Sequence, residues 1–519
     1  MSIPAKCTVL VVGGGPAGSY AASVLAREGI DTVVLEAEKF PRYHIGESLL
    51  PSVRYFLDFI ELYDDFNAHG FLRKVCALYN PLVQKQYVRL SSSSHTGADT
   101  DFVGAGGAGN HAWNVLRSEA DDILFRHSEK SGATVFDGVK VQALDFTQSN
   151  SNDIPGRPVS ASWSRKSDAT SGIINFDYLV DASGRAGLMS TKYMKNRTHN
   201  KQLQSMALWG YWKGAGTYGP GAGDPFSEAV VDGSGWAWFI PLHNGTVSVG
   251  VTLKQDSVLA KKKAYGSDSS KSFYLACLQD TPGIAELLRD AKLDESVDIK
   301  SAADWSYNAR EYAHPHTRIA GDAGCFIDPL FSSGVHLAMT GGLSAAVSIC
   351  ASIRGNCTEK EAAAWHSAKI TEAYTRFLLV VRSAIEQIHG KDKAVLNRLD
   401  ESNFDEAFDH FRPIIQGTVD AGGRLSQAEV DRSVEFCTRV IQKVDSGCLA
   451  NMDSSSTADF TARGAAATYS DSRHCDEVMM KMVRMNRILD LHSFTADPVN
   501  GMMPNVERGT LGLVKQVPA

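Results

Sequence analysis

The chain has 519 residues, of which 43% are hydrophobic and 21% charged, and its formal net charge is -7. This length allows two or three structural units with sizeable cores. The acidic balance, without a dense run of Lys or Arg, argues against a surface for nucleic acid or an anionic membrane. We therefore expect a soluble protein that acts on small molecules.

The nine cysteines are an odd number and include no Cys-x-x-Cys pair. Their spacing predicts reduced thiols in a cytoplasmic protein and no metal site. No cleavable signal pattern is expected at the N-terminus. Residues 377–381 are interpreted as the most apolar later stretch. That stretch is far shorter than the roughly 18 residues that span a membrane, so no membrane association is expected.

The first 36 residues predict a βαβ unit with a strand over 8–12, a helix over 16–28 and a strand over 32–36. Between the first strand and the helix the chain reads Gly13-Gly14-Gly15-Pro16-Ala17-Gly18, and Glu36 ends the second strand. Such glycines let backbone N–H groups approach a pyrophosphate at a helix N-terminus, while the acid accepts a ribose hydroxyl. The pattern indicates a dinucleotide site. Residues 104–109 repeat these letters without a βαβ frame and are interpreted as a loop.

Later segments continue the alternation of strands and helices. The sequence predicts short helices within 51–68, a loop over 91–101, a strand end and helix over 112–131, and a surface connection over 150–172. Two further strands end at Asp181, before a turn with Gly184, and at Gly321-Asp322. With the glycine turn, these resemble flavoproteins of the aromatic-hydroxylase type, in which the Gly-Asp carboxylate contacts the ribityl chain of FAD. Arg117 matches a cofactor-contacting arginine of that group, with an exposed arginine at a helix start as the alternative.

Residues 203–254 change to β-type alternation, with strands expected at 207–212, 227–231, 236–240 and 247–253. One of them reads Trp236-Ala237-Trp238-Phe239-Ile240-Pro241. Side chains at i and i+2 share one face of a strand, so both indoles should form a bulky apolar wall. Such a wall could separate two compartments, or it could fill the core of a sheet.

The remainder is expected to be mainly helical, with apolar residues at helical spacing over 359–387, a mobile loop over 454–472 and no periodicity after Asn500. The predicted fold is mixed α/β. Its parts are an FAD-binding Rossmann-like domain over 1–200 and 300–355, a β-sheet substrate or tunnel region over 201–299, and a helical C-terminal subdomain with a flexible tail over 356–519.

Several of these motifs together resemble the flavin-dependent halogenases, most closely the fungal branch that acts on phenolic polyketides such as resorcylic lactones. The resemblance covers roughly residues 5–345, and the Trp-x-Trp-x-Ile-Pro motif is its most specific part. The resemblance also rests on residues 13–18, Pro41-Arg42-Tyr43-His44-Ile45-Gly46-Glu47-Ser48, Lys74, and Asp328-Pro329-Leu330-Phe331-Ser332-Ser333-Gly334-Val335.

The resemblance implies a division of chemistry between two sites. A separate flavin reductase supplies FADH2, which reacts with O2 to a C4a-hydroperoxide, and this oxidises chloride or bromide to hypohalous acid. The acid reaches a second pocket, where Lys74 delivers the halogen to an electron-rich ring of a free substrate. A lysine in such a tunnel would be partly desolvated, which lowers its pKa.

The resemblance also assigns roles to individual positions. Ser333 and Gly334 would bind halide through backbone N–H groups and a hydroxyl, a role compatible with Ser333 as an ordinary helix N-cap. Trp236, Trp238 and Pro241 would act sterically. The positions expected to line FAD are Gly13, Gly14, Gly15, Ala17, Gly18, Glu36, Glu47, Ser48, Arg117, Asp181, Gly184, Asp322, Pro329 and Val335.

One position departs from the tryptophan-specific branch, which has a glutamate where this chain has Phe331. A phenol activates its own ring through the oxygen lone pair, so the departure favours a phenolic substrate over a free indole. Two alternatives share the flavin scaffold: an FAD-dependent aromatic monooxygenase (phenol hydroxylase) that uses NADPH, and a non-catalytic flavin-binding protein. The paired tryptophans, Lys74 and the need for a separate reductase distinguish a halogenase from the hydroxylase. The intact lysine and halide turn argue against the non-catalytic protein.

Overall fold

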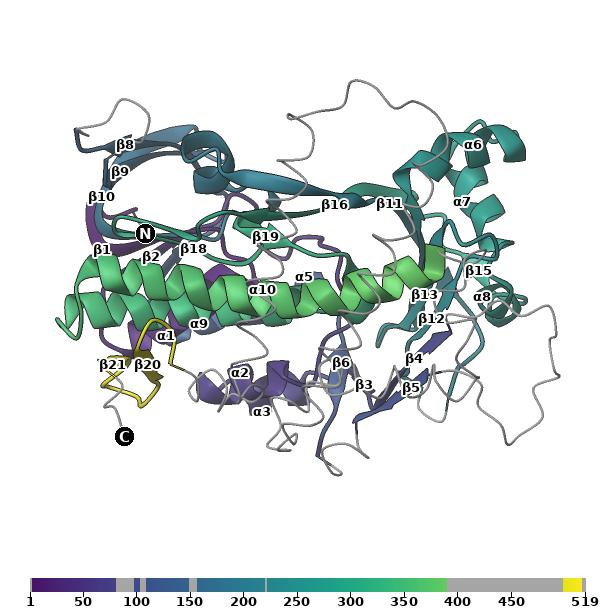
Figure 1. Cartoon of the computed structure of the whole chain (residues 1–519), viewed down its shortest axis with the longest axis horizontal. Coiled ribbons are helices and arrows are strands. Elements are labelled where there is room, and N and C mark those ends of the chain that lie inside the picture. Colours follow the sequence, from purple (N-terminus) through teal and green to yellow (C-terminus); the bar gives the residue numbers. More distant parts are fainter. Residues whose placement is uncertain are drawn as a thin grey trace, which may run out of the picture.

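The computed structural model describes residues 2–80, 98–102, 109–148, 156–219, 222–389 and 498–515. Most of the predicted loops over 91–101 and 104–109, and the whole of the loop over 454–472, lie outside these residues. The structure has two large sheets, one toward the left of Figure 1 and one that extends to the right, and the long helix α10 (Glu359–His389) runs along the molecule from one to the other. The mixed α/β class expected from the sequence is confirmed.

The first sheet is built on the predicted βαβ unit, and residues 9–12 and 32–35 of its first two strands are buried, as in a sheet that is covered on both faces. In the order β17-β18-β10-β1-β2-β7, the five strands from β18 to β7 run parallel, while β8 and β9 form an antiparallel extension beside β10. The strands are β1 (Lys6–Val12), β2 (Thr32–Leu35), β7 (Thr134–Phe136), β8 (Val139–Phe146), β9 (Pro158–Arg165), β10 (Thr170–Asp181), β17 (Ala313–His314) and β18 (Thr317–Ile319).

The second sheet is mainly antiparallel and carries the tryptophan motif. Its order is β19-β16-β11-β14-β13-β12-β4-β5, with β15 beside β11. The strands are β4 (Cys76–Asn80), β5 (Ala98–Asp101), β11 (Arg197–Lys213), β12 (Phe226–Ala229), β13 (Gly235–Pro241), β14 (Thr246–Lys254), β15 (Lys292–Leu293), β16 (Lys300–Ala309) and β19 (Cys325–Phe326).

The remaining elements connect and cover the sheets. A separate two-stranded ribbon joins β3 (Leu72–Lys74) to β6 (Ala112–Asn114), and α1 packs against both α5 and α9. The α-helices other than α10 are α1 (Pro16–Arg27), α2 (Val53–Phe59), α3 (Tyr63–Ala68), α5 (Arg117–Lys130), α6 (Gln255–Tyr265), α7 (Ser270–Leu278), α8 (Pro282–Leu287) and α9 (Gly334–Ile353).

The observed elements differ from those predicted in five places. Strand β5 lies within the predicted loop over 91–101, where it pairs with β4. Strand β16 belongs to the second sheet although residues 300–355 were assigned to the FAD domain, and β4 joins it through parallel pairing with β12. Strand β9 lies within the predicted surface connection 150–172. The tail, expected to be flexible, forms a hairpin of β20 (Met502–Asn505) and β21 (Gly512–Lys515) beside α9. Residues 390–497 of the predicted helical subdomain lie outside the described residues.

Helix α9 was missed as an apolar segment by the sequence analysis. It has 20 residues, and its most apolar 18-residue stretch has a mean hydropathy of 1.4, enough in length and composition for a membrane span. Of that stretch, 94% is buried inside the protein. Small residues along it let α1 and the Gly-Asp turn approach closely: a side chain at Gly342 would lie 2.6 Å from the Ala17 carbonyl oxygen. Burial on all sides makes α9 a core helix.

Arg318 ties β18 to the two long helices. Its side chain is fully buried, its Nε donates to Ser348 Oγ on α9 at 2.9 Å, and its guanidinium lies 2.8 and 3.0 Å from the two Glu359 carboxylate oxygens at the start of α10. A buried guanidinium is tolerated because this bidentate pairing satisfies its charge and donors.

Removing the partner of that guanidinium should destabilise the fold. We expect Glu359→Ala to lower the free energy of unfolding by about 3–5 kcal/mol, because Arg318 would remain buried and unpaired. Glu295→Ala, which breaks the exposed pair with Lys271, is the matched control and should leave the thermal midpoint nearly unchanged. Equal midpoints for the two variants, measured by calorimetry, would contradict this account.

Candidate active site

The glycine turn is held by close packing that only glycine permits. Gly13 has φ +104°, and a Cβ there would lie 2.2 Å from the Ala182 carbonyl oxygen. A Cβ on Gly14 would lie 2.7 Å from the Phe125 ring, and one on Gly18 would lie 1.9 Å from the Gly13 carbonyl oxygen. A Cβ at Gly15 would meet only the Arg42 guanidinium, at 3.3 Å. A cation over a tight turn at the start of α1 suits a pyrophosphate.

Two acidic residues that were predicted to contact the cofactor accept hydrogen bonds that stabilise turns in the structure. Glu36 accepts the Gly14 and Glu38 N–H groups at 2.6 and 2.8 Å. Asp181 is fully buried and accepts the N–H and hydroxyl of Ser183 and the N–H of Met189. Each carboxylate thus has a structural role in positioning its turn, and Gly184, with φ +63°, lies three positions after Asp181. Their contacts with FAD stay predictions.

The Gly-Asp turn lies against the glycine turn. A Cβ at Gly321 would come within 3.0 Å of Ala17 Cβ, and Ala17 shares an apolar cluster with Val335 at the start of α9. The Asp322 carboxylate makes no hydrogen bond to any described residue, and burial raises its pKa to about 6 against the lowering effect of nearby arginines, although the side chain keeps some exposure. An unpartnered acceptor at this position fits a ribityl hydroxyl, as does the cradle of glycines beside it.

Arg117 is buried at the start of α5, so the alternative of an exposed arginine is wrong. Its guanidinium donates to both oxygens of Asp121 and to the Ile45 carbonyl oxygen at 2.8 Å. It therefore fixes the loop that carries Glu47 and Ser48. The side chain also comes within 2.9 Å of where a Cβ on Gly46 would lie, which explains the glycine there.

Lys74 ends β3 and is almost fully buried, with 1% of its surface exposed. Its Nζ donates to Ser48 Oγ at 3.1 Å and to the Leu49 carbonyl oxygen at 3.2 Å, and it lies 5.2 Å from the centroid of the Phe102 ring. No carboxylate within the described residues forms an ion pair with it. Burial, opposed by the more distant Asp224, lowers its pKa from 10.5 to about 8.

The strand that carries Lys74 is fixed by residues that the sequence analysis missed. Asp224 accepts the backbone N–H groups of Val75 and Cys76 at 3.2 and 3.1 Å. On the paired strand β6, Asn114 donates to the Gly223 and Pro241 carbonyl oxygens at 2.7 and 3.0 Å. These bonds tie the lysine ribbon to the end of the tryptophan motif. The sequence signal for Asp224 is its place after Gly223, and Asn114 has no comparable signal.

The two tryptophans lie on one face of β13, as the strand period predicted, with ring centroids 5.7 Å apart. Both are buried in a cluster that also contains Leu50, beside the Lys74 site, and Phe331 from the predicted halide turn. Trp238 donates to Ser248 Oγ at 3.3 Å. Pro241 closes the strand and accepts from Asn114. The indole wall thus contacts segments of both predicted compartments.

The predicted halide turn leads into α9. Ser332 has φ +57°, Ser333 is buried at the N-cap position, and Gly334 is exposed with open space where a Cβ would point. Ser333 thus occupies the expected N-cap position, but its side chain makes no capping hydrogen bond. The first-turn N–H groups of a helix have no partner within the helix, and they suit an anion.

Two neighbours of this turn are also placed by the structure. Pro329 is exposed in the short helical turn η4 (Pro329–Phe331), and Asp328 accepts the Leu330 N–H at 3.1 Å. Burial raises the pKa of Asp328. The nearby Trp236 indole N–H opposes that rise, although its geometry does not make a hydrogen bond.

Glu47 belongs to a hydrogen-bond network that the sequence analysis did not predict. Tyr211 donates to its carboxyl at 2.7 Å, Tyr43 lies 3.0 Å from the Tyr211 hydroxyl, and Trp209 Nε1 donates to Tyr43 at 2.6 Å. Burial raises the pKa of Glu47 to about 7, so its proton can be gained or lost near neutral pH. Ser48, the next residue, contacts Lys74.

The parallel sheet, the glycine turn at the start of α1 and the adjoining Gly-Asp turn define a flavoprotein with a Rossmann-like FAD domain. A family model described as tryptophan halogenase matches residues 8–89 and 98–418. Sulochrin halogenase gedL of Aspergillus terreus is 50% identical over 99% of this chain and 94% of that protein. Flavin-dependent halogenase ascD of Acremonium egyptiacum is 48% identical, with the same coverage of both chains. The chain belongs to the flavin-dependent halogenases, in the branch that these fungal enzymes represent.

Solved structures agree in fold. The crystal structure of the flavin-dependent halogenase CmlS matches 85% of this chain and 78% of its own, with a TM-score of 0.65 and 24% identity. Halogenase PltM in complex with phloroglucinol and FAD matches 92% of this chain and 96% of its own, with a TM-score of 0.61 and 15% identity. The predicted flavoprotein architecture is confirmed.

The buried amine of Lys74 should make stability depend on pH. Because the folded pKa is lower than the unfolded value, folding disfavours the ammonium, and this cost is complete below pH 8 and disappears as pH approaches 10.5. Lys74→Met removes a cost of about 3 kcal/mol, so its stability relative to wild type should be highest near pH 7 and decrease toward pH 10.

The control for this effect is Lys261→Met. Lys261 lies 2.7 Å from both Asp232 and Asp280, and its pKa is raised although burial acts against this. That variant should be destabilised across the same pH range. Thermal midpoints recorded from pH 7 to 10 test both, and a pH-independent difference between Lys74→Met and wild type would contradict the account.

Proposed function

We propose that this halogenase chlorinates the ring of a free phenolic compound of the polyketide type, in the cytoplasm, with FADH2 supplied by a separate flavin reductase. Bromide would serve as a second halide. The name of the sulochrin halogenase, and the phloroglucinol in the PltM complex, support a phenolic ring as the substrate. The buried Phe331 supports it further, because a ring that is activated by its own oxygen needs no carboxylate at that position.

The observation that carries the proposal is the state of Lys74. Its amine is buried, contacts only neutral oxygens and has a pKa of about 8, so neutral amine and ammonium coexist under physiological conditions. The amine can attack hypohalous acid to form a haloamine and water. Transfer of the halogen to the ring then restores the amine, and the ring carbon loses its proton. The ammonium can instead polarise hypohalous acid by donating a hydrogen bond.

The halide would lie at the start of α9, where exposed Gly334 leaves room beside the buried Ser333 hydroxyl. When bound, reduced flavin with O2 supplies the oxidising power that converts halide to hypohalous acid. The chain's own part is to hold the anion with backbone N–H groups and to exclude the ring. The wall formed by Trp236 and Trp238 would serve the exclusion, because two buried indoles on one face occupy space that an organic ring would need.

Lys74→Ala should abolish halogen transfer. With a flavin reductase, FAD, NADH, O2, chloride and a resorcylic phenol, wild type should yield a product with the isotope pattern of one chlorine. The variant should lose roughly 10²–10⁴-fold in product formation while it still binds FAD and consumes O2. Lys271→Ala, at an exposed lysine, is the control. Full activity of Lys74→Ala, or hydroxylated product formed equally well without chloride, would contradict the proposal.

Ser333→Val should weaken halide use specifically. Loss of a hydrogen bond to an anion should raise the chloride concentration for half-maximal rate by roughly 10–100-fold. Ser332→Gly removes the neighbouring hydroxyl without opposing its positive φ, and it should leave the chloride requirement unchanged. The measurement is product formation against chloride concentration. The same curve for Ser333→Val and wild type would remove Ser333 from the halide site.

A further inference from the structure

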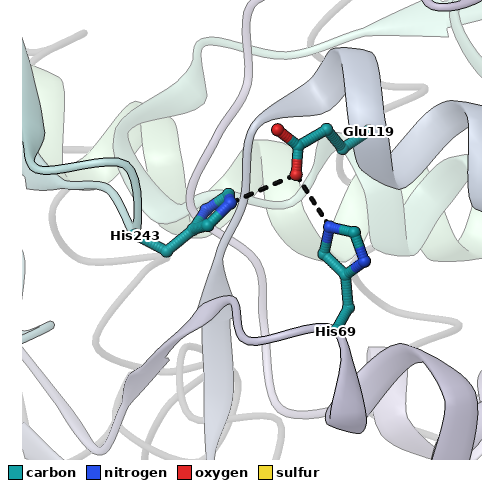
Figure 2. A group of neighbouring side chains, drawn as sticks. All are labelled: His69, Glu119 and His243. Carbon is teal, nitrogen blue, oxygen red and sulfur yellow. Dashed lines mark hydrogen bonds and ion pairs between the residues drawn. The ribbon is translucent and has the colours of Figure 1, made fainter.

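A group of ionisable side chains lies outside the residues assigned above. His69 follows α3, Glu119 is in the first turn of α5, and His243 lies in the turn between β13 and β14. Figure 2 shows both imidazole rings directed at one oxygen of the Glu119 carboxylate. Three segments that are far apart in the sequence therefore converge on one point.

The distances in this cluster are short. Glu119 Oε2 lies 2.7 Å from His69 Nε2 and 3.1 Å from His243 Nε2, and the three candidate ligand atoms all lie within 4.8 Å of one another. Bonds of about 2.0–2.1 Å in a tetrahedral site would separate neighbouring ligand atoms by roughly 3.3 Å. Small outward shifts of these side chains would bring the ligand atoms to that separation and make room for an ion between them.

The residue types select the ion. Two imidazoles and one carboxylate suit Zn2+ and related first-row ions and are poor ligands for Ca2+ or Mg2+. Partial exposure of all three side chains leaves a coordination position for water. The rings are also held in place, because Phe71 packs against both, with centroids 4.4 Å from His69 and 5.2 Å from His243.

We propose that His69, Glu119 and His243 form a binding site for one divalent transition-metal ion, with Zn2+ as the preferred occupant. The site joins the loop before β3, five positions ahead of Lys74, to the turn two positions after Pro241. A bound ion would strengthen the connection that Asn114 makes between these segments. The role is structural, and it does not depend on the identity of the organic substrate.

The test measures metal binding by the full chain after chelator treatment and desalting. Titration with zinc chloride is followed by calorimetry and metal analysis. Wild type should bind one more equivalent of zinc than His69→Ala or His243→Ala, or these variants should bind that zinc at least about 100-fold more weakly. Cobalt should give visible d–d absorption without a thiolate charge-transfer band. Zinc should raise the thermal midpoint of wild type but not that of His69→Ala or His243→Ala.

Glu119→Gln separates a metal site from a hydrogen-bonded cluster. Its amide oxygen can still accept from both neutral imidazoles, so the cluster and the fold should survive, but it is a poor metal ligand. We expect this variant to lose the zinc equivalent, whereas His199→Ala, at an exposed histidine outside the cluster, should retain it. Equal zinc binding by wild type and Glu119→Gln would overturn the proposal, as would a thiolate band in the cobalt spectrum.

Discussion

The site depends on burying one amine without giving it a carboxylate. Two lysines of this chain show the contrast. Lys261 has two aspartates at 2.7 Å and is held as an ammonium, whereas Lys74 contacts a hydroxyl, a carbonyl oxygen and a ring face. Burial opposes the ammonium form of both amines, but only Lys261 has aspartates in contact that raise its pKa, and Lys74 is the more deeply buried of the two. Only the second arrangement leaves an amine that can carry a halogen.

Such a side chain needs a rigid backbone, because a buried charge without a counter-ion favours movement toward water. The ribbon of β3 and β6 is short and cannot supply this rigidity alone. Asp224 compensates by accepting two N–H groups just after Lys74, and Gly223 lets this loop approach, since a Cβ there would lie 2.3 Å from the Arg73 carbonyl oxygen. The acid thus serves the backbone of the strand and leaves the amine without an ion pair.

Sequence reasoning succeeded where the signal is local or carried by a motif. The glycine turn and the shared face of the tryptophans follow from backbone geometry within a few residues, and the desolvation expected of Lys74 agrees with its burial, while its catalytic role stays a prediction. Asn114 and Asp224 were missed because their function lies in bonds to segments more than 100 positions away. The pairing of β4 with β12 was missed for the same reason. Expected contacts of Glu36 and Asp181 with FAD stay predictions, since both acids already brace turns.

The register of β13 explains how one strand can serve as both wall and core. Trp236 and Trp238 face the cluster with Phe331, while Ala237 and Phe239 face a second cluster beneath α7 and α8, so a slip by one residue would exchange the two faces. Gly250 opposes Trp238 on β14, and a Cβ there would lie 2.1 Å from the indole. Any side chain at this position would displace the ring. The glycine therefore fixes the register of β13, and with it the face on which the two indoles lie.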